Sequence, residues 1–132
     1  MIRFTFTRFA MAGAAILAGG AALAHHSTAM FAWGKEVKIA SAVVERWEWT
    51  NPHTFLYVTV GSEHWAFEGM SPNHLGRIGW DKRTLKPGDK IALTYYALKD
   101  GRKGGFDVSV TLPSGQTLKQ LSSPTDDPSK AQ

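Results

Sequence analysis

The hydrophobic and polar positions of this chain alternate with a period of two over several stretches, the pattern of half-buried β-strands. In the first stretch, residues 37–49, most apolar side chains share one parity, while Lys38, Arg46 and Glu48 share the other. Asn51-Pro52 ends this stretch, because proline fixes its own backbone and moves the preceding residue out of helical conformation. The pattern predicts one long strand, whose core-facing side chains are Val37, Ile39, Val43, Trp47 and Trp49.

The rest of the pattern predicts shorter strands and one helix. Ser71 suits a helix N-cap and Pro72 the first helical position. Leu75 and Ile78 lie three residues apart on one helical face, so we expect a helix of about two turns here. The remaining strands are expected at 53–60, 64–68, 90–98 and 106–112, with a last extended segment at 117–121.

The order of these elements favours one fold. A short helix between the third and fourth of five strands is the order of an OB-fold, a small, partly open Greek-key barrel. The 132 residues suffice for one core and not for two. We expect an all-β domain with one short helix, an OB-fold-like five-stranded barrel. Another small antiparallel sandwich stays open, since one sequence does not give strand pairing.

Both ends of the chain differ in composition from its middle. The first 24 residues carry Arg3 and Arg8, no acid, and then an apolar run of small residues that is shorter than the ~20 of a membrane span. Residues 122–132 contain no apolar side chain larger than alanine. We therefore expect a signal peptide at 1–24, a β-barrel domain at 25–121 and a disordered tail at 122–132.

Export would narrow the function classes. Loss of Arg3 and Arg8 with the signal peptide lowers the formal net charge from +4 to +2, a weak electrostatic footprint for nucleic acid. The chain has no cysteine, so burial or a metal must hold an exported domain together. We expect a periplasmic or secreted protein with no membrane span after cleavage and no nucleic-acid partner.

Catalytic motifs are missing from the sequence. It contains no Gly-x-x-x-x-Gly-Lys phosphate loop, no serine in a nucleophile elbow and no His-Glu-x-x-His zinc helix. A cysteine nucleophile is excluded as well, since the chain has no cysteine. Hydrolytic catalysis is therefore unsupported, and a binding role is favoured over an enzymatic one.

The histidines suggest a metal. Cleavage after Ala24 gives His25 a free α-amino group beside its imidazole, and both lose a proton near neutral pH at little cost. One further imidazole makes three nitrogen donors, a set that suits copper. His26 is adjacent, His53 follows the rigid Asn-Pro step, and His74 lies early in the expected helix, whose dipole disfavours a protonated ring. The predicted metal ligands are His25, His26, His53 and His74; histidines that are exposed or purely structural are the alternative.

Sulfur and aromatic side chains offer further chemistry. Met30 and Met70 are soft thioethers that suit cuprous ion, although single methionines usually serve packing. OB-fold barrels bind saccharides or single strands by aromatic stacking on strands two and three. Glu68 faces away from the aromatic side of its strand, and Arg77 could join it in a polar site. The predicted ligand-groove residues are Trp47, Trp49, Tyr57, Glu68 and Arg77; a simple core-filling role for the tryptophans is the alternative.

Short motifs follow one another along the chain. They are His25-His26-Ser27, Trp49-Thr50-Asn51-Pro52-His53, Glu68-Gly69-Met70-Ser71-Pro72-Asn73, Arg77-Ile78-Gly79-Trp80, Leu85-Lys86-Pro87-Gly88-Asp89 and Lys103-Gly104-Gly105. In this order they resemble a family of small exported bacterial proteins catalogued only as a domain of unknown function (domain-of-unknown-function family 6152). The resemblance implies no activity. A looser similarity, at His25 alone, is to periplasmic copper-binding proteins and to copper monooxygenases that use a histidine brace.

These observations predict a periplasmic metal-binding protein, with copper as the metal, for sequestration or delivery. Two alternatives stay open. One is a binding module without metal, which holds a saccharide, a peptide or a partner protein in an aromatic groove. The other is an accessory subunit of a periplasmic complex, whose partner would be another periplasmic protein.

Overall fold

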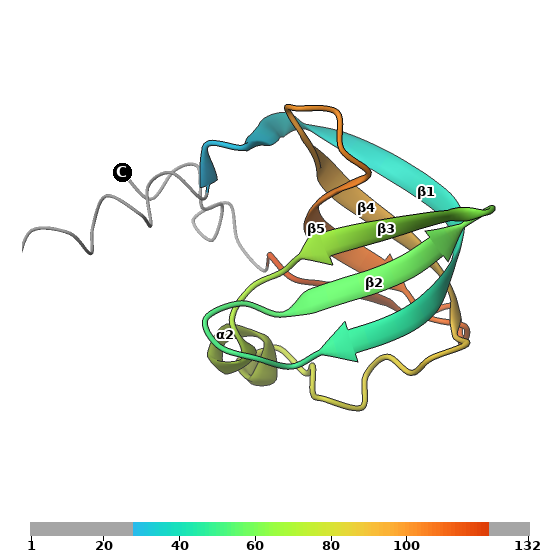
Figure 1. Ribbon diagram of the computed structural model, residues 1–132. Helices are drawn as coiled ribbons and strands as arrows, with labels where there is room; N and C mark the ends of the chain where they lie inside the picture. Colours follow the sequence, from blue (N-terminus) through green and yellow to red (C-terminus); the bar gives the residue numbers. More distant parts are fainter. Residues whose placement is uncertain (1–27, 122–132) are drawn as a thin grey trace, which may run out of the picture.

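Six strands and one short helix make up residues 28–121, the part of the chain that the computed structural model describes (Figure 1). The predicted signal peptide and the predicted tail lie outside these residues. In this described part no helix is long and apolar enough to cross a membrane. The elements are β1 (Phe31–Glu48), β2 (Phe55–Val60), β3 (Glu63–Glu68), α2 (Pro72–Arg77), β4 (Lys90–Leu98), β5 (Gly104–Thr111) and β6 (Thr117–Lys119).

The strands form one sheet that closes on itself. Their order is β3-β2-β1-β4-β5-β6, and a parallel pairing of β3 with β5 joins the two sides. Glycine is required at this seam, because a Cβ on Gly104 would overlap the carbonyl of Ala66 and a Cβ on Gly105 that of Tyr96. Strands β1 to β5 make the barrel, and β6 pairs antiparallel with the second half of β5. The expected OB-fold-like five-stranded barrel with one short helix is confirmed.

Most predicted boundaries agree with the structure. Strand β4 has the expected limits, whereas β1 begins at Phe31 rather than at Val37. Helix α2 begins as the sequence predicts: Pro72 is in its first turn, and the Ser71 hydroxyl accepts a hydrogen bond from the His74 N–H at 3.2 Å. This cap satisfies one of the N–H groups that a helix start leaves without a partner.

The sequence predicts that the odd-numbered apolar side chains of β1 face the core. This prediction is wrong in the middle of the strand. The register of β1 against β4 shifts between Ile39 and Ala42, and its register against β2 shifts between Val44 and Arg46. Such an irregularity inserts a residue into one strand, which moves the following side chains to the other face. Val43, predicted to face the core, is therefore 38% exposed, while the residues on either side of it are buried. The second shift returns Trp47 to the core side.

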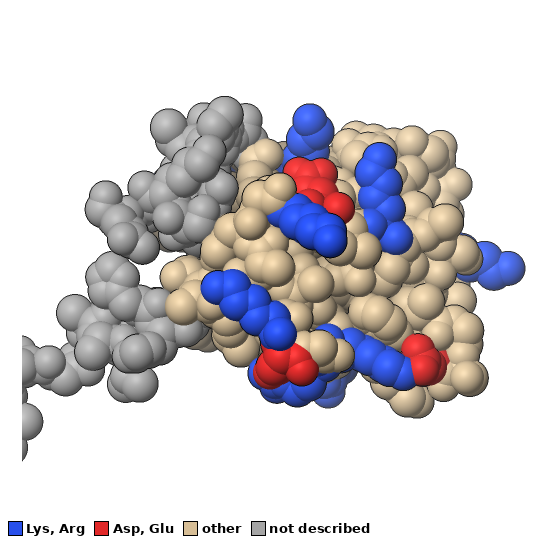
Figure 2. Space-filling model, turned by 90° about the horizontal axis from the view of Figure 1, so that it is seen from above, with Lys and Arg blue, Asp and Glu red and all other residues tan. Residues whose placement is uncertain are grey.

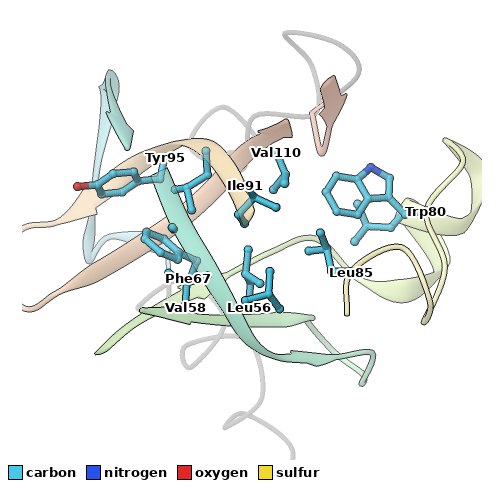
Figure 3. Close-up of a cluster of buried hydrophobic side chains, with 12 residues drawn as sticks. Leu56, Val58, Phe67, Trp80, Leu85, Ile91, Tyr95 and Val110 are labelled. Carbon is cyan, nitrogen blue, oxygen red and sulfur yellow. The ribbon is translucent and has the colours of Figure 1, made fainter. Parts of the chain in front are cut away.

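The barrel interior holds the main hydrophobic core. Its side chains point toward one another from β1 to β5 and from the segment after α2 (Figure 3). The indole N–H of Trp80 donates to the carbonyl of Lys119 at 3.1 Å and so ties this segment to β6. Labelled members of the core are Leu56, Val58, Phe67, Trp80, Leu85, Ile91, Tyr95 and Val110.

A second, smaller cluster of buried side chains lies beside this core. It consists of Phe31, Tyr96 and Phe106, with Met30 and Trp33 packed against it. The ring of Trp33 meets those of Phe31 and Tyr96 edge to face, with centroids 5.5 and 5.0 Å apart. These contacts fix the first described residues of the chain against β4 and β5.

Candidate functional site

An imidazole and a carboxylate pair at one end of β2 and β3. The antiparallel register places Phe55 opposite Glu68, and His53 lies two residues before Phe55. The Glu68 carboxylate is hydrogen-bonded to Nδ1 of His53. This bond raises the pKa of His53 above its ordinary value, while partial burial works in the opposite direction. The Nε2 atom is then the ring nitrogen left to bind a metal or exchange a proton.

The backbone around this pair is held by a short network. The carbonyl of Met70 accepts hydrogen bonds from the Thr54 N–H at 3.2 Å and from its hydroxyl at 2.9 Å. The N–H of Gly69 donates to the carbonyl of Thr54 at 2.9 Å, and the N–H of Met70 to Oε1 of Gln120 at 2.7 Å. Thr54, which follows His53, and Gly69, which follows Glu68, are therefore hydrogen-bonded to each other. This bond holds the backbones that carry the imidazole and the carboxylate close together.

Glu68 also lines a hollow of about 140 Å³. Met30 lies on the wall of this hollow, and its carbonyl accepts a hydrogen bond from the Lys99 N–H at 2.9 Å. The cation at the hollow, Arg102, is bound by Asp100, with Nε 2.7 Å from Oδ2. The full lining is Met30, Phe31, Phe55, Ala66, Glu68, Leu98, Arg102 and Gly105.

The remaining predicted metal ligands are not brought to this pair within residues 28–121. The Nε2–H of His74 donates to the carbonyl of Gln120 at 2.9 Å, which ties α2 to the end of β6. Nowhere among the described residues do three or more His, Cys, Asp or Glu side chains form a group that could hold a metal. His25 and His26 lie outside the described residues, so a site of three donors at His53 stays a prediction that depends on them.

The two tryptophans predicted for the groove, Trp47 at the end of β1 and Trp49 just after it, lie on the core side. Trp47 is opposite the buried Leu56 in the register of β1 and β2. Its ring packs against those of Trp49 and Trp80, with centroids 5.9 and 5.8 Å away. Its indole N–H donates to the carbonyl of Asp81 at 3.1 Å. The two tryptophans are thus partly buried and pack against the main core, and their part in a ligand groove stays a prediction.

The other predicted groove residues, Tyr57, Glu68 and Arg77, belong to β2, β3 and α2. The ring of Tyr57 is covered by the guanidinium of Arg46, which lies 4.1 Å from the ring centroid, and stacks on Phe55 at 6.5 Å. Glu68 faces outward, as the sequence predicts, and its carboxylate binds His53. Arg77 is exposed at the last residue of α2. Strand alternation therefore places Trp47 on the opposite face of the sheet from Tyr57 and Glu68, and a groove that joins all five residues stays a prediction.

One polar pair was not anticipated from the sequence. Asp107 is fully buried, and its Oδ2 accepts a hydrogen bond from Nε2 of Gln120 at 2.6 Å. Its Oδ1 is also buried and has no hydrogen-bond partner among the described residues. Burial raises the pKa of Asp107 from 3.8 to about 7 despite the opposing hydrogen bond. Gln120 thus links a buried acid to the backbone network beside His53 and Glu68.

The charged side chains on one face of the molecule do not gather into a further site. On the face that Figure 2 shows, Lys and Arg side chains are interspersed with Asp and Glu side chains rather than gathered in a patch of one sign. Two of the ion pairs join Arg46 to Glu48 and Lys103 to Glu63. Such exposed pairs contribute ~0–1 kcal/mol each and do not by themselves indicate a ligand.

Comparison with known proteins gives one match. A family model matches residues 14–107, and the family is one of unknown function. This agrees with the resemblance drawn from the motifs. No curated protein and no solved structure matches the chain.

Proposed function

Because the chain belongs to the Family of unknown function (DUF6152), whose name gives no activity, we propose a function from its own residues: an exported copper-binding protein that serves sequestration or delivery. In this proposal His53 is one ligand. The α-amino group and the imidazole of His25 complete the set, with His26 as the neighbouring donor. The proposal includes a location outside the cytoplasm, which the mass spectrometry described below also tests.

The pairing of His53 with Glu68 carries this proposal. A histidine that binds a metal through one ring nitrogen almost always gives its other nitrogen to a carboxylate, a carbonyl or water. Such a partner fixes the ring orientation and makes the free nitrogen more basic. Glu68 supplies this support at Nδ1, and the His53 side chain is 37% exposed, so that Nε2 is within reach of an ion from solvent.

The position of Met30 supports the participation of the N-terminal histidines. Met30 and Glu68 line the same hollow. His26 lies four residues before Met30, and an extended chain covers at most ~3.3–3.6 Å per residue, so His26 is within about 14 Å of Met30. The length of the intervening chain is therefore compatible with donors from 25 and 26 at the carboxylate-bound imidazole.

A second candidate function rests on the outer face of β2. Phe55 and Tyr57 are partly exposed there and stack at 6.5 Å, and Phe55 borders the hollow beside Glu68. Aromatic rings at the mouth of a hollow suit a ligand with a flat or saccharide ring. This favours the binding module without metal as the alternative, in which ligand binding would quench tryptophan or tyrosine emission in the absence of copper.

The test combines the exported protein with copper. Mass spectrometry of protein secreted by its host first establishes whether the chain begins at His25. Copper(II) titration of the wild type, His25→Ala and His53→Ala then measures affinity, and both variants are expected to lose about tenfold or more. A wild-type chain with one extra N-terminal residue, which keeps every histidine but displaces the amine, should lose a similar factor.

A matched control is available on β3, the strand that also carries Glu68. His64 also bonds a glutamate through Nδ1, with Glu45 Oε1 at 2.6 Å, but its side chain is 80% exposed at the opposite end of β3. His64→Ala should keep wild-type affinity. Equal copper affinity in the wild type, His25→Ala and His53→Ala would overturn the proposal.

A further inference from the structure

We propose that the outer face of β1, β4, β5 and β6 binds an acidic oligosaccharide, a chain of sugars of which some carry a carboxylate or sulfate group. The site is a hollow of about 390 Å³ on these four strands. We call it the hydroxyl hollow, because Thr94, Ser109, Thr111 and Thr117 line it. The proposed copper site lies beside β2 and β3, so this inference goes beyond the proposed function and does not depend on it.

One row of side chains crosses all four strands of this face. The register pairs Lys38 with Thr94, Thr94 with Ser109, and Ser109 with Lys119. Side chains directly opposite each other in a sheet share a face, and Thr94 follows the buried Leu93, so the row lies on the outer face. Neighbouring strands are roughly 4.8 Å apart, so the backbones of the two lysines stand roughly 14 Å apart at the ends of the row.

Small side chains give the hydroxyl hollow its depth. In the row next to the first, Ala92 is opposite Thr111, and Thr111 is opposite Thr117. Ala40 of β1 also lines the hollow. Alanine leaves space between the longer side chains around it, so a ligand in this space reaches the hydroxyls of both rows.

The hydroxyls are available to a ligand. Among the described residues, no hydrogen bond engages the hydroxyl of Thr94 or of Ser109, and both residues are partly exposed. The hydroxyls of Thr111 and Thr117 lie 2.8 Å apart and are hydrogen-bonded to each other. Only one of these two donates its proton to the other, so the second keeps a proton for a ligand. Each hydroxyl can also accept, which matches the donors and acceptors of a sugar.

The charge around the hydroxyl hollow favours an anion. Lys38 lines it, Lys119 ends the first row, and Lys90, two residues before Ala92, is on the same side of β4. All three lysines are exposed, and within residues 28–121 none of them forms an ion pair. Glu36, two residues before Lys38, is an acid on the same face of β1, but it does not line the hollow. Positive charge therefore predominates here.

The density of this charge distinguishes between classes of anion. Nucleic acid and polyphosphate carry a negative charge on every unit and need many cations to bind. Three lysines around a set of hydroxyls match a ligand that is mostly polyol and only sparsely charged. In addition, the described residues that line the hollow include no aromatic ring on which a nucleic-acid base could stack. These observations favour an acidic oligosaccharide.

The test measures ligand binding to the exported chain by isothermal titration calorimetry, after metal has been removed with a chelator and the chelator by dialysis. The acidic probes are an oligogalacturonate, which carries carboxylates, and a heparin oligosaccharide, which carries sulfates. A neutral maltooligosaccharide and inorganic polyphosphate are the comparison probes. We expect at least one acidic probe to bind, with an affinity that falls as salt is added, and the neutral probe to bind about tenfold or more weakly.

Charge variants locate the site. Lys38→Gln should weaken binding of the acidic probe by about two- to fivefold, the effect of one exposed ion pair. The combination of Lys38→Gln with Lys119→Gln should weaken it by about tenfold. Lys82→Gln removes an equal charge from the exposed connection between α2 and β4 and should keep wild-type affinity. Because all of these side chains are exposed, circular dichroism should show that every variant folds.

Each contrary outcome overturns a stated part of the inference. Wild-type affinity in the double variant, or an equal loss in Lys82→Gln, would place the ligand elsewhere on the protein. Equal affinity for the neutral probe would refute the role of the lysines. Binding of polyphosphate without either acidic oligosaccharide would refute the ligand class, and no binding of any probe would refute the site. The copper titrations use other residues, so the proposed function stands or fails independently.

Discussion

The buried carboxyl of Asp107 should make the stability of this protein fall as the pH rises. Within residues 28–121, its Oδ2 accepts a hydrogen bond from Nε2 of Gln120 and its Oδ1 has no partner. Replacement by asparagine keeps the shape and the Gln120 contact but removes the ionisation. The perturbation therefore isolates the cost of a charge inside the barrel.

The size and sign of the effect follow from the pKa. Burial raises the pKa of Asp107 from 3.8 to about 7 in the folded state. Between these values the folded protein holds a proton that the unfolded chain has released, so the free energy of unfolding falls with rising pH. The contribution is fully present below the unfolded pKa and is lost as the pH reaches the folded pKa. A shift of about three units corresponds to roughly 4 kcal/mol.

Urea denaturation of the wild type and Asp107→Asn between pH 4 and pH 8.5 would measure this effect. The variant bears an amide N–H in place of Oδ1, and this adds a cost that does not depend on pH. The informative quantity is therefore the change with pH in the difference between the two unfolding free energies. We expect the difference to move in favour of the variant by up to roughly 4 kcal/mol across this range. Groups that titrate in both proteins, such as His53, cancel.

A difference that stays constant with pH would refute this reasoning. Asp100→Asn serves as the control, because Asp100 is exposed and hydrogen bonds from Arg102 lower its pKa in the folded state. Its replacement should give no gain in stability at high pH. Because the pKa of Asp107 is raised and that of Asp100 is lowered, a systematic effect of replacing aspartate by asparagine would appear in both variants, whereas the predicted pH dependence would appear in Asp107→Asn alone.

Three further predictions concern the site and the framework that holds it. Glu68→Gln should lower the pKa of His53, since the bond to the carboxylate is the largest cause of its raised value, and NMR titration of the ring protons would reveal an unchanged pKa if this is incorrect. Gly105→Ala should lower the free energy of unfolding in urea by at least ~1–3 kcal/mol, because its Cβ would overlap the main chain of β4. Gly76→Ala, which lies in open space within α2, should raise it by ~0.5–1 kcal/mol. Similar effects of the two substitutions would contradict the geometry of the β3–β5 seam. Ser71→Ala should cost about 1 kcal/mol through loss of the helix cap, and an unchanged melting temperature would argue against that cap.

Much of the fold follows from the sequence because its signals are local. Alternation gives the strands, and the Ser71-Pro72 step gives the start of α2. The register shifts of β1 were not predicted, because the expectation followed the parity of the flanking residues. The sequence did hold a clue, since Val43 and Val44 are adjacent and apolar and Glu45 shares the parity of the predicted core-facing side chains. Parity therefore fails there, and it fails only between the two shifts.

The candidate site could be predicted only in parts. The sequence singles out His53 and Glu68 separately, but their contact depends on the pairing of β2 with β3. The outward parity of Glu68 and the position of His53 before the facing strand were the available clues. Asp107 gives no clue at all, because nothing in Phe106-Asp107-Val108 indicates that its acid is enclosed by Gln120 from the end of the barrel.

The parallel pairing of β3 with β5 also affects the tendency of this protein to aggregate. Strand edges that present unpaired N–H and C=O groups recruit other chains, and proteins survive by covering them. Here Ala66, Phe67 and Glu68 are covered by the start of β5, which leaves only the first half of β3 open on that side. Substitution of the glycines of this junction would expose unpaired N–H and C=O groups on β3 and β5 at once. We therefore expect such variants to form insoluble aggregates rather than a soluble unfolded chain.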